Sequence, residues 1–221
     1  MKTGILGRPQ AGKTSLFSML TGAEVSLTRR EDRLGVAVVP DERLDRLAEL
    51  YQPKKLTHAT LDLVEMGALT PESLRDGSGI AALRTVDALV EVLRAFDPAD
   101  TPAAEARGLE FDMIVSDLGQ VEKRRERVAK DLKKQRTPAL LEEASLLERM
   151  QAHLEGEQPL RTLTLTADED KKTRGFQFLS QKPILYVLNV SEGEAPDLAH
   201  AVARHGLEAS LQAPRTGATA I

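Results

Sequence analysis

A glycine-rich segment near the start of the sequence could bind phosphate. Residues 7–14 read Gly-Arg-Pro-Gln-Ala-Gly-Lys-Thr, which is the pattern GxxxxGK[ST]. Glycine lets consecutive backbone N–H groups curve around phosphate oxygens, where a Cβ atom would obstruct the turn. Lys13 would reach the β- and γ-phosphates and act in catalysis, while the Thr14 hydroxyl would bind Mg²⁺. The segment therefore predicts a nucleotide-binding loop that consists of Arg8, Pro9, Gln10, Ala11, Gly12, Lys13, Thr14 and Ser15.

The residues on either side of this loop predict the elements that would position it. Residues 3–6 are a short apolar strand candidate, and residues 13–21 place Leu16, Phe17 and Leu20 at helical spacing before a stop at Gly22. A strand, a glycine loop and a helix in this order direct the positive N-terminus of the helix at an anion. This context favours a nucleotide site over the alternative, a glycine turn beside an ordinary lysine.

Asp62 is a second candidate site residue, at the end of an apolar strand that we expect over residues 57–64. In proteins with this kind of loop, an aspartate on a later strand holds Mg²⁺ together with the hydroxyl of the loop. We therefore predict that Asp62 and Thr14 bind the metal. The alternative is a solvated aspartate at the end of a strand.

Residues 189–192, Asn-Val-Ser-Glu, follow an apolar strand and could contact a nucleotide base. GTP-binding domains read guanine with Asn-Lys-x-Asp, in which the asparagine braces the loop and the aspartate accepts hydrogen bonds from guanine. Here Val190 replaces the lysine and Glu192 replaces the aspartate, so selection of guanine is weakened and adenine could also bind. Asn189, Val190 and Glu192 are thus predicted base-binding residues, and the predicted ligands are ATP or GTP with Mg²⁺.

The composition limits the class of protein. The chain has 221 residues, of which 29% are charged, and a formal net charge of −4, which is typical of a globular protein and argues against broad nucleic-acid affinity. It has no cysteine, which excludes disulfides and thiolate metal sites. No apolar run approaches the length of a membrane span, and the first residues lead directly into the strand and loop. We expect a cytoplasmic protein without DNA or membrane partners.

Beyond the loop, strand patterns alternate with helix patterns, which is typical of a parallel sheet covered by helices. The apolar run at residues 183–190 needs cover on both faces and so belongs to the same sheet. We expect strands at residues 34–40, 57–64, 88–96 and 183–190, a strand beginning at 217–221, and helices at 41–51, 80–85, 168–180 and 197–205.

The middle of the chain predicts two long helices with apolar seams. A break at Thr137-Pro138 separates them, because proline fits the first turn of a helix but not its interior. Two seamed helices joined by a short turn form an antiparallel hairpin. The first seam, on a helix of about 28 residues interrupted at Arg125, is Phe111, Ile114, Leu118, Val121, Val128 and Leu132, and the second is Leu140, Ala144, Leu147, Met150 and Leu154.

This hairpin predicts an insertion into the nucleotide-binding domain. The expected domains are residues 1–108 plus 180–221, which bind nucleotide, and residues 109–179, which form the hairpin. Residues 123–136 carry eight Lys or Arg against two acids, and could contact ribosomal RNA. The alternatives are a solvated basic face and a partner for the acidic side of the second helix.

Five segments together resemble one family, the YchF (Obg-like) P-loop ATPases, which are related to translation-factor GTPases. The resemblance implies an α/β P-loop NTPase fold that is G-domain-like, with a mostly parallel sheet and an inserted antiparallel helical hairpin. It also implies a cytosolic nucleotide hydrolase that associates with ribosomes, and the Asn-x-x-Glu sequence is characteristic of the family and of its use of ATP as well as GTP. The matching segments are residues 4–17, 35–45, 93–96, 117–118 with 121–124, and 182–192.

The sequence departs from the family pattern in both nucleotide-sensing switches. Counted from Asp62, the glycine of the usual Asp-x-x-Gly falls on Glu65, and Gly67 could take its place only after a two-residue insertion. The threonine expected in the first switch aligns with Arg29, beside Thr28. Met66 is the counterpart of the apolar residue that the family has in place of a catalytic glutamine.

These departures lead us to predict that nucleotide binding survives better than hydrolysis. The leading interpretation is a nucleotide-binding protein with weak or conditional ATP or GTP hydrolysis. The alternative is a non-catalytic module with degenerate switches that docks on a ribosome or protein, whereas the base-reading segment at residues 189–192 argues against a small-molecule kinase. The family's C-terminal β domain (TGS) does not follow, so we expect a fragment or a truncated relative.

Overall fold

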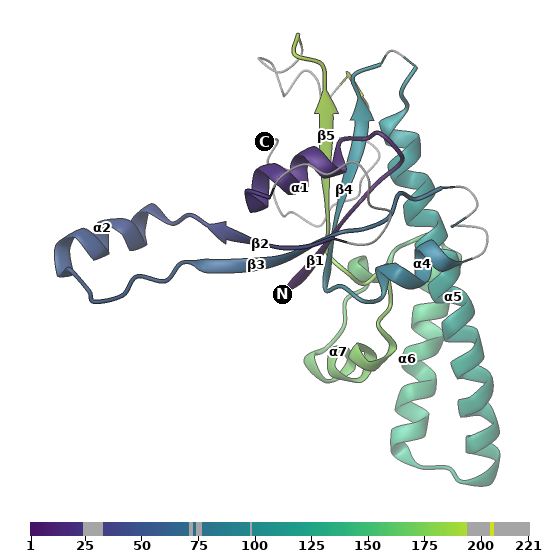
Figure 1. Ribbon diagram of the computed structural model, residues 1–221. Helices are drawn as coiled ribbons and strands as arrows, with labels where there is room; N and C mark the ends of the chain where they lie inside the picture. Colours follow the sequence, from purple (N-terminus) through teal and green to yellow (C-terminus); the bar gives the residue numbers. More distant parts are fainter. Residues whose placement is uncertain (24–32, 71–72, 74–76, 98, 194–203, 206–221) are drawn as a thin grey trace.

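A five-stranded sheet forms the centre of the computed structural model, which describes residues 1–23, 33–70, 73, 77–97, 99–193 and 204–205 (Figure 1). The strand order is β2-β3-β1-β4-β5, in which β3, β1, β4 and β5 run parallel and β2 is antiparallel to β3. This confirms the mostly parallel sheet. The strands are β1 (Lys2–Leu6), β2 (Arg33–Val39), β3 (Ala59–Glu65), β4 (Ala88–Ala95) and β5 (Ile184–Val190).

Helices cover both faces of this sheet. On one face, Phe17 of α1 packs on Ile5, Leu63 and Val92, and on the other face α4 and α5 cover Leu6 and neighbouring side chains. Burial on both faces explains why the parallel strands are so apolar. The helices are α1 (Lys13–Thr21), α2 (Glu42–Tyr51), α4 (Ser78–Leu83), α5 (Pro102–Lys134), α6 (Pro138–Glu155) and α7 (Ala167–Thr173), with short 3-10 turns η1 (Leu160–Thr162) and η2 (Arg174–Phe176).

The predicted hairpin is present as α5 and α6, which lie side by side below the sheet in Figure 1. The side chain of Thr137 caps α6 by accepting a hydrogen bond from the Leu140 N–H at 3.3 Å, and Pro138 occupies the first turn. Between the helices Arg124 donates two hydrogen bonds to Glu143, at 2.7 and 3.0 Å. The interior consists of Ile114, Val121, Val128, Leu146, Leu147, Met150 and Leu154.

The hairpin differs from the expectation at its root. Helix α5 begins at Pro102 and has 33 residues, so it extends across the proposed domain boundary at residue 108. Phe111, expected at the start of the seam, is 49% exposed. The reason is that Leu109 and Met113 pack against the sheet in this part of α5. Phe111 is two positions from each of them and therefore lies on the opposite side of the helix.

The outer ends of β2 and β3 extend beyond the other strands of the sheet, and α2 connects them there (Figure 1). We call this projecting part the arm. Asp41 caps α2 as its residue type predicts, because its carboxylate accepts a hydrogen bond from the Arg43 N–H at 3.0 Å. However, no residue of α2 is buried, and Leu50 and Tyr51 are 73% and 74% exposed. The amphipathic pattern therefore predicted the helix correctly but not burial of its apolar side.

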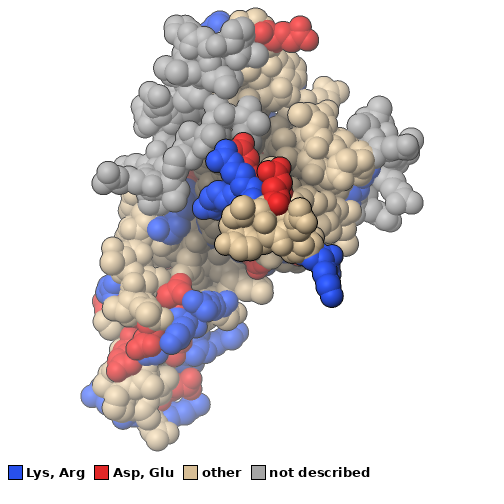
Figure 2. Space-filling model, turned by 90° about the vertical axis from the view of Figure 1, so that its left-hand side faces the viewer, with Lys and Arg blue, Asp and Glu red and all other residues tan. Residues whose placement is uncertain are grey.

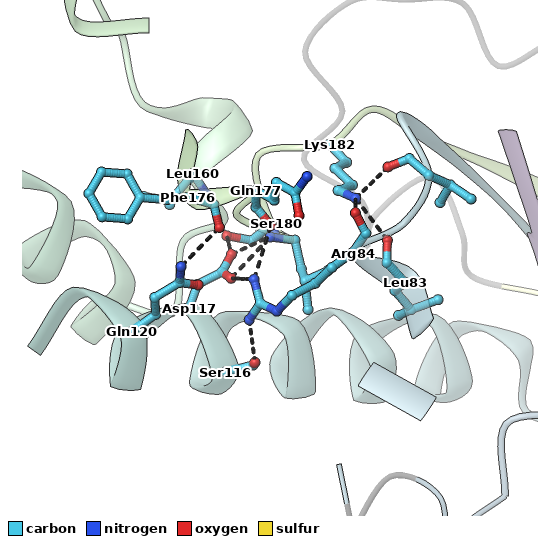
Figure 3. A network of polar contacts seen from close by, with 12 residues as sticks. Leu83, Arg84, Ser116, Asp117, Gln120, Leu160, Phe176, Gln177, Ser180 and Lys182 are labelled. Atoms are coloured by element: carbon cyan, nitrogen blue, oxygen red, sulfur yellow. Dashed lines mark hydrogen bonds and ion pairs between the residues drawn. The ribbon is translucent and has the colours of Figure 1, made fainter. Parts of the chain in front are cut away.

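A buried polar network joins α5 to the segment before β5 (Figure 3). Asp117 is fully buried and accepts hydrogen bonds from the N–H groups of Leu179 and Ser180 and from the Ser180 hydroxyl, at 2.7–3.0 Å. Burial raises the pKa of Asp117, while these hydrogen bonds and Arg84 oppose the rise. Nearby, Lys182 donates to the carbonyls of Leu83, Arg84 and Val86 at the end of α4. The network fixes the root of the hairpin.

Two expected C-terminal elements fall on residues that the structure does not describe. These are the helix at residues 197–205, of which only 204 and 205 are described, and the strand beginning at 217–221. Among the described helices, none combines the length and the apolar character that a membrane span requires.

Candidate functional site

The glycine loop between β1 and α1 has the backbone conformation of a phosphate cradle. Gly7 and Gly12 have φ values of 144° and 102°, which L-residues with a Cβ rarely adopt. A Cβ on Gly7 would lie 2.4 Å from the Val92 carbonyl oxygen, and one on Gly12 would lie 2.6 Å from Nδ2 of Asn189. Gly12 is the N-cap of α1 and offers no side-chain acceptor, so it does not cap the first N–H groups of the helix. The geometry therefore suits an external anion.

Lys13 lies inside the curve of the loop. Its side chain is 8% exposed, and Nζ donates to the carbonyl oxygens of Gly7 and Arg8 at 3.1 and 2.8 Å. Burial lowers the pKa of Lys13, and the carboxylates of Glu65 and Glu105 oppose this change. The ammonium group is thus held at the place where phosphate charge would be bound.

Glu65, and not Asp62, is the carboxylate beside Thr14. The Thr14 hydroxyl donates a short hydrogen bond to Oε1 of Glu65. Asp62 pairs with Lys2 at the start of β1, whereas Glu65 pairs with Ile5 near its end. Three residues along a strand correspond to about 10 Å, so Asp62 is remote from the loop. The predicted pairing of Asp62 with Thr14 is therefore not present, and Glu65 lies at the Thr14 hydroxyl instead.

The pair of Thr14 and Glu65 fits Mg²⁺ chemically. A hydroxyl and a carboxylate are hard oxygen ligands, and Mg²⁺ in nucleotide sites binds one or two such groups together with phosphate oxygens and water. Within the described part of the chain, no group of three or more His, Asp or Glu side chains could hold a metal by itself. A metal at this site would therefore depend on oxygens from a bound nucleotide.

Other predicted loop residues differ in their surroundings. Ala11 is fully buried, and its carbonyl oxygen accepts a hydrogen bond from Nδ2 of Asn189 at 3.0 Å. This contact places the asparagine where a brace for the loop is expected. Pro9, Gln10 and Ser15 are exposed, and Gln10 has a left-handed φ of 62°. Val190 ends β5, and Glu192 lies exposed in the turn that follows.

Arg8 connects the loop to the first turn of α5. Its Nε lies 3.5 Å from Oε1 of Glu105. The neighbouring Glu91 is buried, and desolvation followed by the charge of Glu105 raises its pKa to about 8. Burial also raises the pKa of Glu105, and the charge of Arg8 opposes this rise. The sequence pattern did not indicate either acid.

The two expected switch segments are only partly described. Thr28 and Arg29 lie outside the described residues. Met66 is 4% exposed and packs in the core on the face of the sheet opposite α1, so it does not face the loop. Counted from Glu65, the glycine position of Asp-x-x-Gly falls on Ala68 and the next position on Leu69, whose N–H donates to the Gly7 carbonyl at 3.2 Å.

Comparisons with known proteins identify relatives of the chain in sequence and in fold. No family model matches the chain. The ribosome-binding ATPase YchF of Bacillus subtilis is 33% identical over 214 residues, which cover 89% of this chain and 58% of the relative, and that of Haemophilus ducreyi is 32% identical over 208 residues, which cover 86% and 57%. The structure of the Schizosaccharomyces pombe YchF GTPase matches 93% of this chain and 63% of that chain with a TM-score of 0.69 and 24% identity, which shows the fold.

The chain thus spans a little under three fifths of the length of the curated relatives that it matches. The expected α/β P-loop fold with an inserted helical pair is confirmed. Over most of its length the chain is thus homologous to the YchF ATPases, and it shares their fold.

Proposed function

We propose that this chain binds ATP or GTP with Mg²⁺ at residues 7–14 and acts as a ribosome-associated protein of YchF type with weak or conditional nucleotide hydrolysis. The observation that carries the proposal is the phosphate cradle itself, in which two glycines adopt conformations that exclude a Cβ and Lys13 lies buried inside the turn. The curated relatives are named ribosome-binding ATPases, which supports the same role for this chain.

Each residue of the site has a distinct part in this proposal. The loop N–H groups and the N-terminus of α1 would bind the phosphate oxygens, and Lys13 would neutralise charge at the β- and γ-phosphates. Thr14 and Glu65 would hold Mg²⁺, which when bound offsets the negative charge of the phosphates. Asn189 braces the loop through Ala11, so the base-reading segment and the phosphate cradle keep a fixed relation.

Weak hydrolysis follows from what lies beyond β3. The position at which a catalytic glutamine would orient the attacking water is Leu69 when counted from Glu65, and Met66 when counted from Asp62. Both side chains are apolar and buried, at 6% and 4% exposure. Neither can orient water, so turnover would depend on positioning by the loop and on charge stabilisation by Lys13. The alternative function, a non-catalytic docking module, is favoured by the same two residues.

Removing the Lys13 ammonium group is expected to weaken binding of ATP and GTP by about 10- to 100-fold, the range typical of a charged hydrogen bond. The measurement is equilibrium binding of Mg²⁺-nucleotide to Lys13→Ala and to the parent chain. Lys172→Ala is the control, because it removes an equally charged but exposed side chain that pairs with Glu142 on the hairpin. Unchanged affinity in Lys13→Ala would contradict nucleotide binding at this loop. Equal hydrolysis rates of Lys13→Ala and the parent would favour the non-catalytic module.

The hairpin supplies a surface for the ribosomal part of the proposal. In Figure 2 the lower part of the molecule carries Lys and Arg intermixed with Asp and Glu. Part of the basic segment at residues 123–136 is used internally, since Arg124 binds Glu143 and Arg125 contacts Gln151. The remaining basic side chains are exposed and could contact phosphate, namely Lys123, Arg127, Lys130, Lys133, Lys134 and Arg136.

Neutralising three of these exposed side chains should weaken ribosome association and lower its salt dependence. For Arg127→Gln, Lys130→Gln and Lys133→Gln combined, we expect the slope of log K against log salt to fall by up to about 0.9 per lost phosphate contact. Co-sedimentation with purified ribosomes across a salt series measures both quantities. The control removes three equally exposed charges from the arm, at Arg43, Arg46 and Lys55. Equal losses in both triple variants would refute docking through the hairpin.

A further inference from the structure

Arg33 lies against the metal side of the candidate site. It is the first residue of β2 and pairs across the antiparallel ladder with Glu65, so both side chains lie on the α1 face of the sheet. Its guanidinium lies over the ring of Phe17, 5.4 Å from the centroid, and Nη1 lies 3.5 Å from Oε2 of Glu65. The side chain is only 18% exposed. Packing against Phe17 and Glu65 therefore restricts the positions that the guanidinium can occupy to the neighbourhood of the loop.

Glu65 connects this guanidinium directly to the phosphate loop. One carboxylate oxygen accepts the hydrogen bond from Thr14 while the other faces Arg33. A single carboxylate thus separates Arg33 from the hydroxyl that would bind Mg²⁺ beside the terminal phosphates. Because Glu65 is buried, this arrangement balances its negative charge.

We propose that Arg33 is a phosphate-sensing residue, which exchanges the Glu65 carboxylate for the terminal phosphate of a bound nucleoside triphosphate. The proposal rests on the proposed function. A guanidinium suits this exchange because its planar fork pairs with a carboxylate or a phosphate in the same way. The guanidinium keeps its contact with the Phe17 ring during the exchange. This contact limits the side-chain entropy that Arg33 loses when it binds the phosphate. A nucleoside diphosphate has no terminal phosphate at that place, so Arg33 stays with Glu65 and distinguishes the two ligands.

The test compares binding of a non-hydrolysable ATP analogue and of ADP, each with Mg²⁺, to the full chain. In Arg33→Gln we expect affinity for the triphosphate to fall by about 10-fold or more and affinity for ADP to change by less than about 3-fold. Arg33→Lys keeps the charge but not the fork, so an intermediate loss is expected. The control is Arg149→Gln, which removes the same charge from an α6 guanidinium that pairs with Glu169 of α7.

Three results would overturn the proposal. Equal losses for ATP analogue and ADP would show that Arg33 only supports the fold of the site. A gain in triphosphate affinity in Arg33→Gln would show that Arg33 competes for Glu65 and does not contact phosphate. If the parent chain binds neither nucleotide, the proposed function itself fails. Thermal unfolding of each variant shows whether it is folded, and Arg33→Lys carries the comparison if the glutamine variant is not.

Discussion

Replacing Asp117 by alanine is expected to lower the free energy of unfolding by about 3–5 kcal/mol, the range observed when one partner of a buried charged network is removed. Asp117 is fully buried, and the substitution leaves the N–H groups of Leu179 and Ser180 and the Ser180 hydroxyl without their acceptor (Figure 3). It also removes the carboxylate that lies 3.6 Å from Nη1 of Arg84. Urea unfolding monitored by circular dichroism measures the loss.

Two further variants make this measurement specific. Asp112→Ala removes a carboxylate five residues earlier on the same helix, where the side chain is only partly buried, and should cost less than about 1 kcal/mol. Ser180→Ala removes one donor to Asp117 and also the acceptor of the Leu160 N–H, and should cost about 1–3 kcal/mol. If Asp117→Ala costs no more than Asp112→Ala, the network does not fix the hairpin root as argued above.

The parts of the fold that local chemistry determines could be predicted from the sequence. Glycine spacing specified the loop, because Gly7 and Gly12 are the described glycines that combine a positive φ with a close contact for a Cβ. Alternating and helical periodicity gave the strands, α1 and the hairpin, since each depends on which side chains a single element buries. Both α5 and α6 begin at a Thr-Pro pair, in which threonine is the N-cap and proline is the first residue of the helix. This pattern marks the start of α5 at Pro102.

The remaining features depend on register between distant elements, which no local pattern contains. Asp62 and Glu65 lie on the same strand, and only pairing with β1 shows which of them reaches the loop. Comparing the end of each apolar strand with the end of β1 would have favoured Glu65. Arg33 carries no such signal, because it contacts the site through a partner 32 residues away. Leu50 and Tyr51 likewise belong to an amphipathic helix in which no residue is buried within the described chain.

Replacing Gly7 in the predicted site by alanine is expected to lower the free energy of unfolding by at least about 3 kcal/mol. Backbone strain at a φ of 144° contributes about 1–3 kcal/mol, and the new Cβ would lie 2.4 Å from the Val92 carbonyl oxygen, a backbone atom that cannot move without disturbing β4. The matched substitution is Gly108→Ala, in an exposed turn of α5 where a Cβ meets no atom within 4 Å. There the change should stabilise the protein by about 0.5–1 kcal/mol, because alanine favours the helix.

Opposite signs for the two substitutions in urea unfolding would establish that the loop conformation is required by the fold. A Gly7→Ala protein as stable as its parent would contradict the cradle geometry on which the nucleotide site depends.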